Sequence, residues 1–92
     1  MLKINTNAQF RKDIKKAKRQ GRNLDELHTV VDLLQKEIVL PPQYRDHPLR
    51  KTNRFIECRD CHIQNDWVLI YRVNKEKNEL DLVRLGTHSE VL

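Results

Sequence analysis

The sequence predicts one α+β domain over residues 1–92: a short N-terminal strand, a two-helix hairpin, then an antiparallel sheet of about three to four strands with the helices packed on one face. Three observations favour this fold. The chain has 92 residues, which suits one small domain. Apolar residues recur at helical spacing through the first 40 residues. From about residue 55 the apolar pattern becomes alternating, which is typical of strands.

The N-terminal strand and the first helix are predicted from residues 2–21. Leu2 and Ile4 alternate with polar residues, which indicates a short strand with one buried face. The helix that follows has a narrow apolar stripe and ends at Gly21, a common helix stop. The stripe contains Phe10, Ile14, Ala17 and Gly21. Most remaining positions are basic: Arg11, Lys12, Lys15, Lys16, Lys18 and Arg19.

A second helix is predicted between Asn23 and the prolines at 41 and 42. Asn23 can cap its N-terminus, and Glu26 stands where a capping box needs a carboxylate. The prolines end the helix, and the short connection to the first helix predicts an antiparallel hairpin. The apolar stripe consists of Leu24, Leu27, Val31, Leu34 and Ile38, widened by Val30 and Leu33.

Three further strands are predicted after a polar linker at residues 43–53. Residues 55–63 alternate in polarity. Residues 67–73 are apolar on both faces except at Arg72, which predicts a central strand. A charged loop at 74–79 leads to the last strand, at 80–85, and Gly86 interrupts that strand.

Basic charge is concentrated at the N-terminus. Residues 1–22 carry eight of the 18 basic side chains and one of the 13 acidic ones, so this segment is +7 although the whole chain is only +5. A cationic helix attracts nucleic acid, an anionic membrane or an acidic protein, and it can also be an ordinary solvated surface. Because no apolar run could span a membrane and no signal-peptide pattern is present, we expect a cytoplasmic protein with no membrane partner.

The segment CRDCH (58–62) has the spacing of a c-type haem attachment motif. It falls in a predicted strand, where residues three apart point to opposite faces. Cys58 and Cys61 should therefore not converge on a haem, a zinc ion or each other. Two part-buried thiols in a reducing cytosol are favoured instead, and we expect neither a metal nor a cofactor.

Another group of residues favours proton transfer on a phosphate substrate. Asp60 and His62 are two apart in a predicted strand, so both should emerge on one face. The other members lie in the linker, near the turn before the central strand, in the last strand and in the tail, all of which can reach one rim of the sheet. The full set is His47, Asp60, His62, Asp66, Arg84 and His88.

Such residues can cleave RNA without a metal. The ribose 2′-hydroxyl attacks the neighbouring phosphate, so a base must take the hydroxyl proton, an acid must protonate the departing 5′ oxygen, and donors must stabilise the phosphorane. Imidazoles and carboxylates suit the first two roles and Arg84 the third. Each residue also has a structural interpretation, as a satisfied histidine, a turn residue or a surface ion pair, and Trp67 as a core anchor. The residues alone leave both interpretations open.

Four segments resemble the YafQ branch of the RelE-type toxins of bacterial toxin–antitoxin modules: YRDHPL (44–49), RDCH (59–62), DWVLIY (66–71) and RLGTHS (84–89). The similarity keeps motif order and spacing through almost the whole chain. It implies a RelE-like ribonuclease fold and a ribosome-dependent endoribonuclease that cleaves messenger RNA during translation. It also implies a cognate, DinJ-like antitoxin, encoded beside the toxin, which neutralises it and with it represses their operon by binding operator DNA.

The resemblance also implies functional positions. Those of the family match His47, His62, Asp66 and His88, with Asp60 and Arg84 as supporting members. The family often ends in an aromatic residue, whereas this chain ends in Leu92. We expect His88 and one of the other two histidines to divide the acid and base roles. The positions expected to bind RNA are Trp67, Lys12, Lys15, Lys16, Lys18 and Arg19.

Two other functions remain open at the level of the sequence. One is a non-catalytic, basic RNA- or DNA-binding module in which the histidines are structural. The other is a metal or haem protein built on Cys58, Cys61 and His62. Loss of activity in a His88 variant would favour the ribonuclease over the first alternative, and a stoichiometric bound metal would favour the second.

Overall fold

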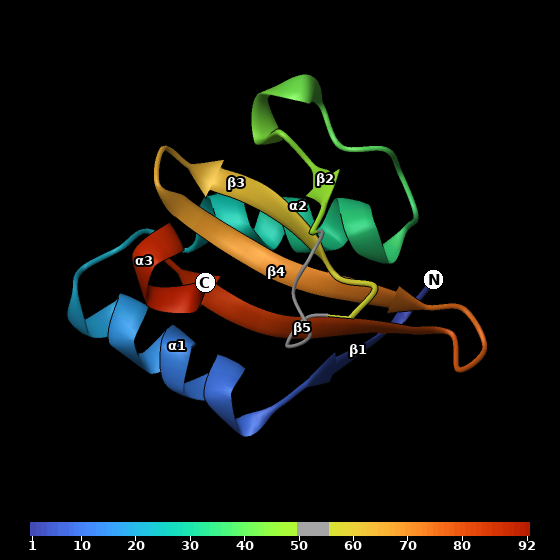
Figure 1. Ribbon diagram of the computed structural model, residues 1–92, viewed down its shortest axis with the longest axis horizontal. Coiled ribbons are helices and arrows are strands. Elements are labelled where there is room, and N and C mark those ends of the chain that lie inside the picture. The colour runs from blue at the N-terminus through green and yellow to red at the C-terminus, as the bar shows by residue number, and fades with distance from the viewer. Residues whose placement is uncertain (50–55) are drawn as a thin grey trace.

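The computed structural model in Figure 1 describes residues 1–49 and 56–92 of the chain. Its helices and strands follow the predicted order of one strand, two helices and a run of strands, with one short helix added at the end. The elements are β1 (Lys3–Thr6), α1 (Ala8–Arg19), α2 (Asp25–Gln35), the 3₁₀ turn η1 (Pro42–Tyr44), β2 (His47–Pro48), β3 (Arg59–Gln64), β4 (Trp67–Asn74), β5 (Glu79–Gly86) and α3 (His88–Val91).

The strands form one sheet in the order β1-β5-β4-β3-β2. β4 is central and antiparallel to both β3 and β5, which confirms the prediction for residues 67–73. The sheet is larger than predicted, because β2 forms inside the expected linker and because β1 joins the far edge, parallel to β5. The predicted strand at 55–63 begins only at Arg59, and its first position, Phe55, lies outside the described residues.

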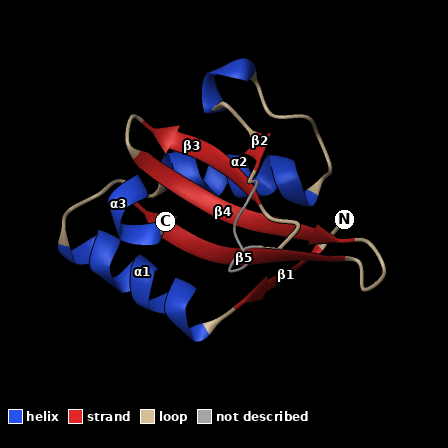
Figure 2. Cartoon of the chain, viewed as in Figure 1, coloured by secondary structure: helices blue, strands red, loops and turns tan. Residues whose placement is uncertain are grey.

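The two faces of the sheet are covered unequally. α1 and α2 run in opposite directions and cover the larger core, as predicted, with α2 behind the sheet in Figures 1 and 2. α3, which the sequence did not predict, lies on the opposite face, where its Val91 joins a small cluster with Cys58, Val68 and Ile70. None of the helices in the described part of the chain is long and apolar enough to cross a membrane.

Both long helices end in the same hydrogen-bonded turn, although only one of them has the expected glycine. At the end of α1, Gly21 has a φ of 73° and the N–H of Arg22 donates to the carbonyl of Ala17. At the end of α2, Glu37 takes the left-handed position with a φ of 59°, and the N–H of Ile38 donates to the carbonyl of Leu33. This Schellman geometry ends α2 before the prolines.

The predicted α2 is therefore too long, and its capping box is wrong. The helix ends at Gln35, so Ile38 is 49% exposed and does not belong to the buried stripe. Asn23 does accept a hydrogen bond from the N–H of Asp25, at 2.8 Å. Glu26 does not complete a capping box, because its carboxylate accepts a hydrogen bond from the hydroxyl of Tyr44 at 2.7 Å.

Side chains of the α1 segment complete the edge of β5 where β1 ends. β1 pairs with β5 only as far as Leu82. Beyond that point, the side-chain amide of Asn7 donates to the carbonyl of Val83 at 3.3 Å, and the N–H of Leu85 donates to the carboxylate of Asp13 at 2.9 Å. These bonds satisfy backbone groups that an open sheet edge would leave unpaired. Of the two residues predicted to form a buried face, Leu2, just before β1, is buried, whereas Ile4 within the strand is exposed.

Candidate active site

Five of the six predicted catalytic residues gather at the β2–β3 end of the face that carries α3. Asp60 and His62 both emerge there from β3, and His47 lies directly across from Asp60 in β2. His88 begins α3, and Asp66 lies in the turn between β3 and β4. The ring centroids of His62 and His88 are 5.0 Å apart, and those of His47 and His62 are 6.4 Å apart.

Asp60 is the buried centre of this cluster, with 1% of its surface exposed. Its Oδ2 atom lies 3.4 Å from Nε2 of His88 and 3.9 Å from Nε2 of His47. Its Oδ1 atom has no hydrogen-bond partner among the described residues. A buried carboxylate with so few donors depends on a nearby positive charge, and the two imidazoles are placed to supply it.

All three imidazoles are held through Nδ1. His47 Nδ1 lies 2.7 Å from the carbonyl oxygen of Arg45, and His62 Nδ1 lies 3.0 Å from that of Asn65. His88 Nδ1 lies 2.8 Å from Oδ1 of Asp66. Carbonyl and ionised carboxylate oxygens only accept hydrogen bonds, so each Nδ1 carries a proton. The atom that gains or loses a proton is therefore Nε2 in every ring.

Asp66 differs from Asp60 in its exposure and its partners. Its side chain is 64% exposed, and it accepts hydrogen bonds from both the ring and the backbone N–H of His88. The bond from the His88 ring lowers the pKa of Asp66 below its usual range, with the backbone bond as the next cause. His88 thus has one carboxylate at each ring nitrogen, Asp66 at Nδ1 and Asp60 at Nε2.

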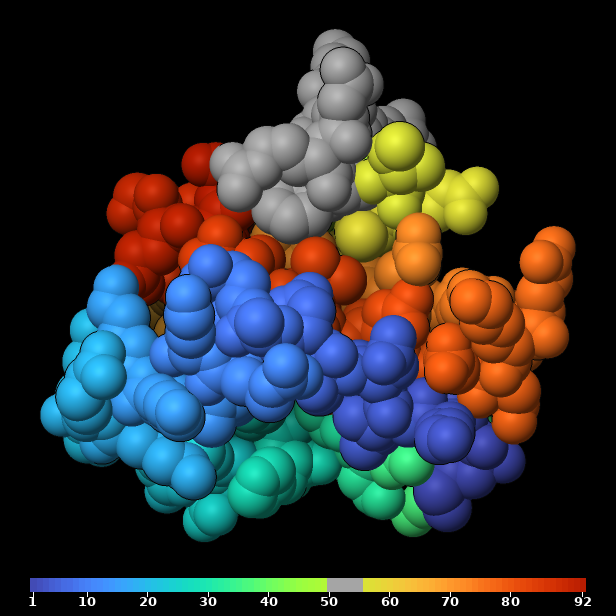
Figure 3. Space-filling view, turned by 90° about the horizontal axis from the view of Figure 1, so that it is seen from below, coloured from blue at the N-terminus to red at the C-terminus, as the bar shows by residue number. Residues whose placement is uncertain are grey.

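The α3 segment positions His88 through three local features. Gly86 lets α3 fold back closely onto the sheet, because a Cβ there would lie 3.1 Å from both Glu90 Oε1 and Val91 Cγ1. Thr87 and Glu90 form a capping box. Glu90 also pairs with Lys16 of α1, and Figure 3 shows α3 immediately beside α1. The sequence indicated a break at Gly86 but not this role, because the contacts arise only after folding.

A part-buried network at Asp46, the residue before β2, supports the position of His47. The hydroxyl of Tyr71 donates to Asp46 Oδ1 at 2.6 Å, and Arg59 Nε donates to both oxygens of the same carboxylate. Burial and this hydrogen bond raise the pKa of Tyr71, so the phenol keeps its proton and remains a donor. Sequence reasoning missed this network, because Tyr71 has the pattern of an ordinary core residue in β4.

Arg84, the sixth predicted site residue, makes its ion pair outside the histidine cluster. Its guanidinium pairs with Asp13 of α1, with its Nε atom 2.9 Å from Oδ2. Asp13 was not expected to matter, although a signal was present. It lies three residues after Phe10 and four before Ala17, so it shares the buried stripe of a helix that otherwise carries cations.

Trp67 and the two cysteines belong to the core. Trp67 is 2% exposed and packs on the α1–α2 face, with the guanidinium of Arg22 4.9 Å from its ring centroid. The ring of Trp67 is therefore not exposed in this structure for the RNA binding that was predicted. Cys58 and Cys61 lie in separate clusters on opposite faces, as predicted from the strand geometry. Burial raises the pKa of both thiols and keeps them protonated.

Asp60, His62 and His88 offer ligand atoms within 4.8 Å of one another, so these side chains could hold a metal ion. Two imidazoles and one carboxylate suit a borderline metal such as zinc or copper better than magnesium or calcium. The sequence prediction considered metal ligands only around the cysteines. The possible ligands shown by the structure are the same side chains that would transfer protons.

The cationic face of α1 is exposed as predicted. Figure 3 shows α1 spread across one side of the molecule. The predicted RNA-binding positions on this helix, all exposed, are Lys12, Lys15, Lys16, Lys18 and Arg19. A groove between α1 and α3 is lined by three of these cations together with Arg84, Asp13 and Glu90. α3 links this groove to the histidine cluster, because its Glu90 lines the groove and its His88 belongs to the cluster.

Comparison with known proteins gives consistent matches over nearly the whole chain. A family model described as the bacterial toxin of the type II toxin–antitoxin system, YafQ, matches residues 2–92. The mRNA interferase toxin YafQ of Escherichia coli (strain B / BL21-DE3) is 34% identical over 87 residues, which cover 94% of this chain and 90% of the relative.

Solved structures also match the fold over its whole length. A metal-bound toxin from Helicobacter pylori has a TM-score of 0.92 at 42% identity, and the match covers 100% of both chains. The E. coli DinJ–YafQ complex contains a chain with a TM-score of 0.87 at 32% identity, and that match covers 100% of this chain and 99% of the other.

Proposed function

The chain belongs to the YafQ family of bacterial toxins of type II toxin–antitoxin systems, and we propose that it is an mRNA interferase that cleaves messenger RNA on the ribosome. The main support for this proposal is that three imidazoles lie together around the buried carboxylate of Asp60. Each of them is held by a hydrogen bond at Nδ1. This arrangement places proton donors and acceptors together at an accessible rim of the sheet.

His88 is the general acid in this proposal. It lies between Asp66 and Asp60, so its charged form has a carboxylate at each nitrogen. Its Nε2–H would protonate the 5′ oxygen as the P–O bond breaks. Asp66 has no role as the base, because its lowered pKa makes it a weak proton acceptor. Its role is to orient the ring of His88 and to stabilise its charge.

His62 is the general base. Its Nδ1 bonds to a neutral carbonyl, which leaves Nε2 free to take the proton of the 2′-hydroxyl as that oxygen attacks phosphorus. The ring lies 5.0 Å from that of His88, so both can reach one phosphodiester. His47, farther away and near Asp60, would donate to a phosphate oxygen when protonated. The products are a 2′,3′-cyclic phosphate and a 5′-hydroxyl.

Arg84 acts as a positioning residue rather than at the phosphate. Its ion pair with Asp13 ties α1 to the end of β5, and that strand leads directly into α3 and His88. The Asp13 carboxylate also accepts the N–H of Leu85, so one buried group fixes both the side chain and the backbone of β5. Loss of Arg84 would move His88 instead of removing a phosphate contact.

The positive charge of α1 and the family of the chain each indicate binding partners. The exposed cations of α1 would hold ribosomal RNA beside the message, with binding that weakens steeply as salt rises. The solved DinJ–YafQ complexes support a DinJ-like antitoxin as the neutralising partner. We propose that this complex binds operator DNA through the antitoxin. The toxin would act in the cytoplasm, where it meets translating ribosomes.

The decisive experiment compares wild type with His88→Ala after induction in cells, with RNA ends mapped by sequencing. Wild type should arrest growth and produce new 5′ ends within translated messages, whereas the variant should produce neither. Co-purification with the antitoxin serves as the folding control, because the variant should still bind it. Cleavage that persists in the variant would refute the catalytic assignment. A wild type that binds RNA without cutting it would favour the non-catalytic binding module.

A further inference from the structure

A second polar groove, separate from the one between α1 and α3, opens beside His62. It is lined by residues from α2, η1 and the β3–β4 turn: Glu26, Gln43, Tyr44, Arg45, His62, Ile63, Gln64 and Asn65. Figure 1 shows the η1 turn next to the end of β3, where these segments meet. His62 is the one residue shared by this groove and the histidine cluster.

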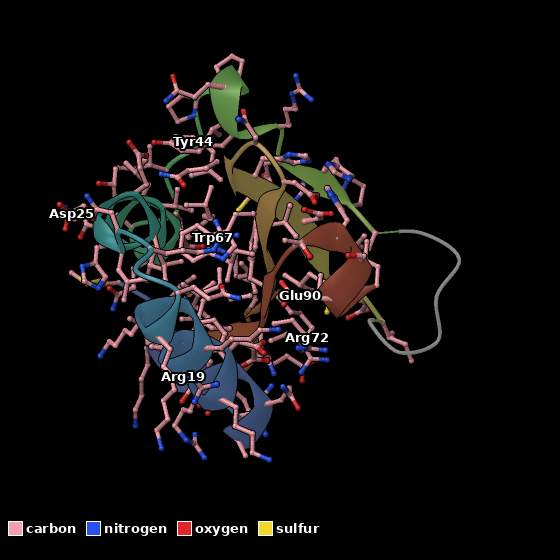
Figure 4. The ribbon with its side chains drawn as sticks, turned by 90° about the vertical axis from the view of Figure 1, so that its left-hand side faces the viewer. Arg19, Asp25, Tyr44, Trp67, Arg72 and Glu90 are labelled. Carbon is pink, nitrogen blue, oxygen red and sulfur yellow. The ribbon has the colours of Figure 1, made fainter. Side chains whose placement is uncertain are left out.

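The groove has a buried floor and a polar rim. Tyr44 and Ile63 are buried, whereas Gln43, Arg45, Gln64 and Asn65 are exposed. Figure 4 shows Tyr44 between η1 and α2, where its hydroxyl is held by Glu26. Two buried side chains, Tyr44 and Ile63, with amide and guanidinium groups around them suit a nucleobase, whose faces are apolar and whose edges carry donors and acceptors.

Arg45 provides independent support for this site. It is a non-glycine residue with a φ of 47°, in the left-handed region that most side chains avoid. In this conformation its carbonyl holds Nδ1 of His47 while its side chain lines the groove. The three arginines that lie in strands, Arg59, Arg72 and Arg84, each pair with an aspartate. Arg45 has no ion-pair partner within residues 1–49 and 56–92.

Asn65 connects the groove to the reaction. Its carbonyl accepts the hydrogen bond from Nδ1 of His62, and the residue itself lines the groove. A base seated against the β3–β4 turn would therefore contact the same segment that orients the proposed general base. Occupation of the groove and alignment of His62 would be coupled through this one turn.

We propose that this groove binds a nucleotide of single-stranded RNA next to the scissile phosphate, and that Arg45, Gln64 and Asn65 set the base preference there. The inference rests on the proposed ribonuclease function. The amides of Gln64 and Asn65 would hydrogen-bond the edge of the base, and Arg45 would contact the base or its phosphate. This nucleotide would be positioned before proton transfer, so its contribution would appear in both binding and sequence selection.

The test uses ribosomes programmed with a pool of messages randomised around the cleavage site. Gln64→Ala removes one amide, and Arg45→Gly removes the guanidinium while keeping a residue that tolerates the positive φ. Each variant should weaken base preference at one flanking position by roughly tenfold and raise KM more than it lowers kcat. Gln20→Ala and Lys77→Ala, exposed residues outside the groove, are the matched controls and should leave the preference unchanged.

The outcomes separate this inference from the proposed function. If wild type cuts and both groove variants keep its base preference, the groove site is refuted while the ribonuclease stands. If wild type does not cut, the ribonuclease proposal fails instead. A groove variant that loses only antitoxin affinity would assign the groove to the antitoxin and also refute the inference.

A measurement on wild type covers the case in which a variant does not fold. An RNA oligonucleotide with a 2′-deoxy residue at the cleavage position cannot be cut, because the attacking hydroxyl is absent. Titration of this oligonucleotide should shift the side-chain amide NMR signals of Gln43, Gln64 and Asn65 more than that of Gln20. Saturation of the protein with no shift of the groove amides would overturn the proposal.

Discussion

The two faces of the sheet centre carry opposite kinds of side chains in neighbouring positions. Cys61, Leu69 and Leu85 lie in one row across three strands and are buried against α1 and α2. One position back along β3, Asp60 lies beside Ile70 on the other face, and one of its oxygens has no partner among the described residues. The apolar face provides the burial that stabilises the fold, so the other face can keep a carboxylate in a costly environment.

The largest effect separating the two faces should come from His88→Ala. Removal of the proposed acid should lower the cleavage rate by roughly 10²–10⁴-fold. The free energy of unfolding should fall by about 1–3 kcal/mol, because the buried carboxylate of Asp60 loses one of its two imidazole neighbours. Cleavage on programmed ribosomes and urea unfolding measure the two quantities. A rate within tenfold of wild type would contradict the assignment.

Leu69→Ala on the opposite face should show the reverse pattern. Leu69 is fully buried in the larger core, so truncation should cost about 2–5 kcal/mol of unfolding free energy. The cleavage rate per folded molecule should stay within about threefold of wild type, because Leu69 belongs to the larger core on the opposite face from the histidine cluster. Leu69→Val is the milder control if the alanine variant is largely unfolded. A large loss of rate in fully folded protein would show that the faces are not independent.

The local sequence pattern was sufficient to predict the apolar face of the sheet and part of the polar face. β4 was recognised as central because its apolar run leaves no solvent face, and the turn at Gly21 stops α1 as predicted. Asp60 and His62 share a face because alternation in a strand is a property of the backbone. These predictions needed only residues within a few positions of each other.

Contacts between distant parts of the chain could not be read in this way. Asp66 and His88 are 22 residues apart in the sequence, and Asp13 and Arg84 are 71 apart. Neither pairing can be recognised from the residues near each partner. The end of α2 was missed because Glu37 takes a left-handed conformation that usually marks a glycine. α3 has four residues, too few to show a helical period, although it carries His88.

A smaller effect is expected where a core residue supports the polar face. Tyr71→Phe removes only the hydroxyl that donates to Asp46, next to His47. The unfolding free energy should fall by about 1–2 kcal/mol, since Asp46 loses the hydrogen bond from the buried Tyr71 hydroxyl. The cleavage rate should fall a few-fold as His47 loses its fixed position. A displaced His47 ring signal in the NMR spectrum would identify the cause, and an unmoved signal with unchanged stability would contradict it.

The smallest effect should come from Glu90→Gln, which tests how firmly α3 holds the polar face in place. The bond from Lys16, together with the backbone N–H of Thr87, lowers the pKa of Glu90 from 4.5 to about 2. A carboxyl pKa lowered by folding stabilises the folded state above pH 4.5, and this contribution is lost as the pH falls towards 2. Glutamine can still accept the Thr87 bond but cannot pair with a lysine charge.

The variant should therefore have a Tm lower than wild type by less than about 4 °C at pH 7. The difference should shrink between pH 4.5 and pH 3, because Glu90 of the unfolded wild-type chain binds a proton there while the folded carboxylate is still ionised. Cleavage at pH 7 should fall by less than about threefold, since α3 keeps Val91 in the small core and His88 keeps both carboxylates. Glu76→Gln, in the β4–β5 turn, is the matched control. A Tm difference that stays constant with pH would mean that Glu90 holds α3 through its shape rather than its charge.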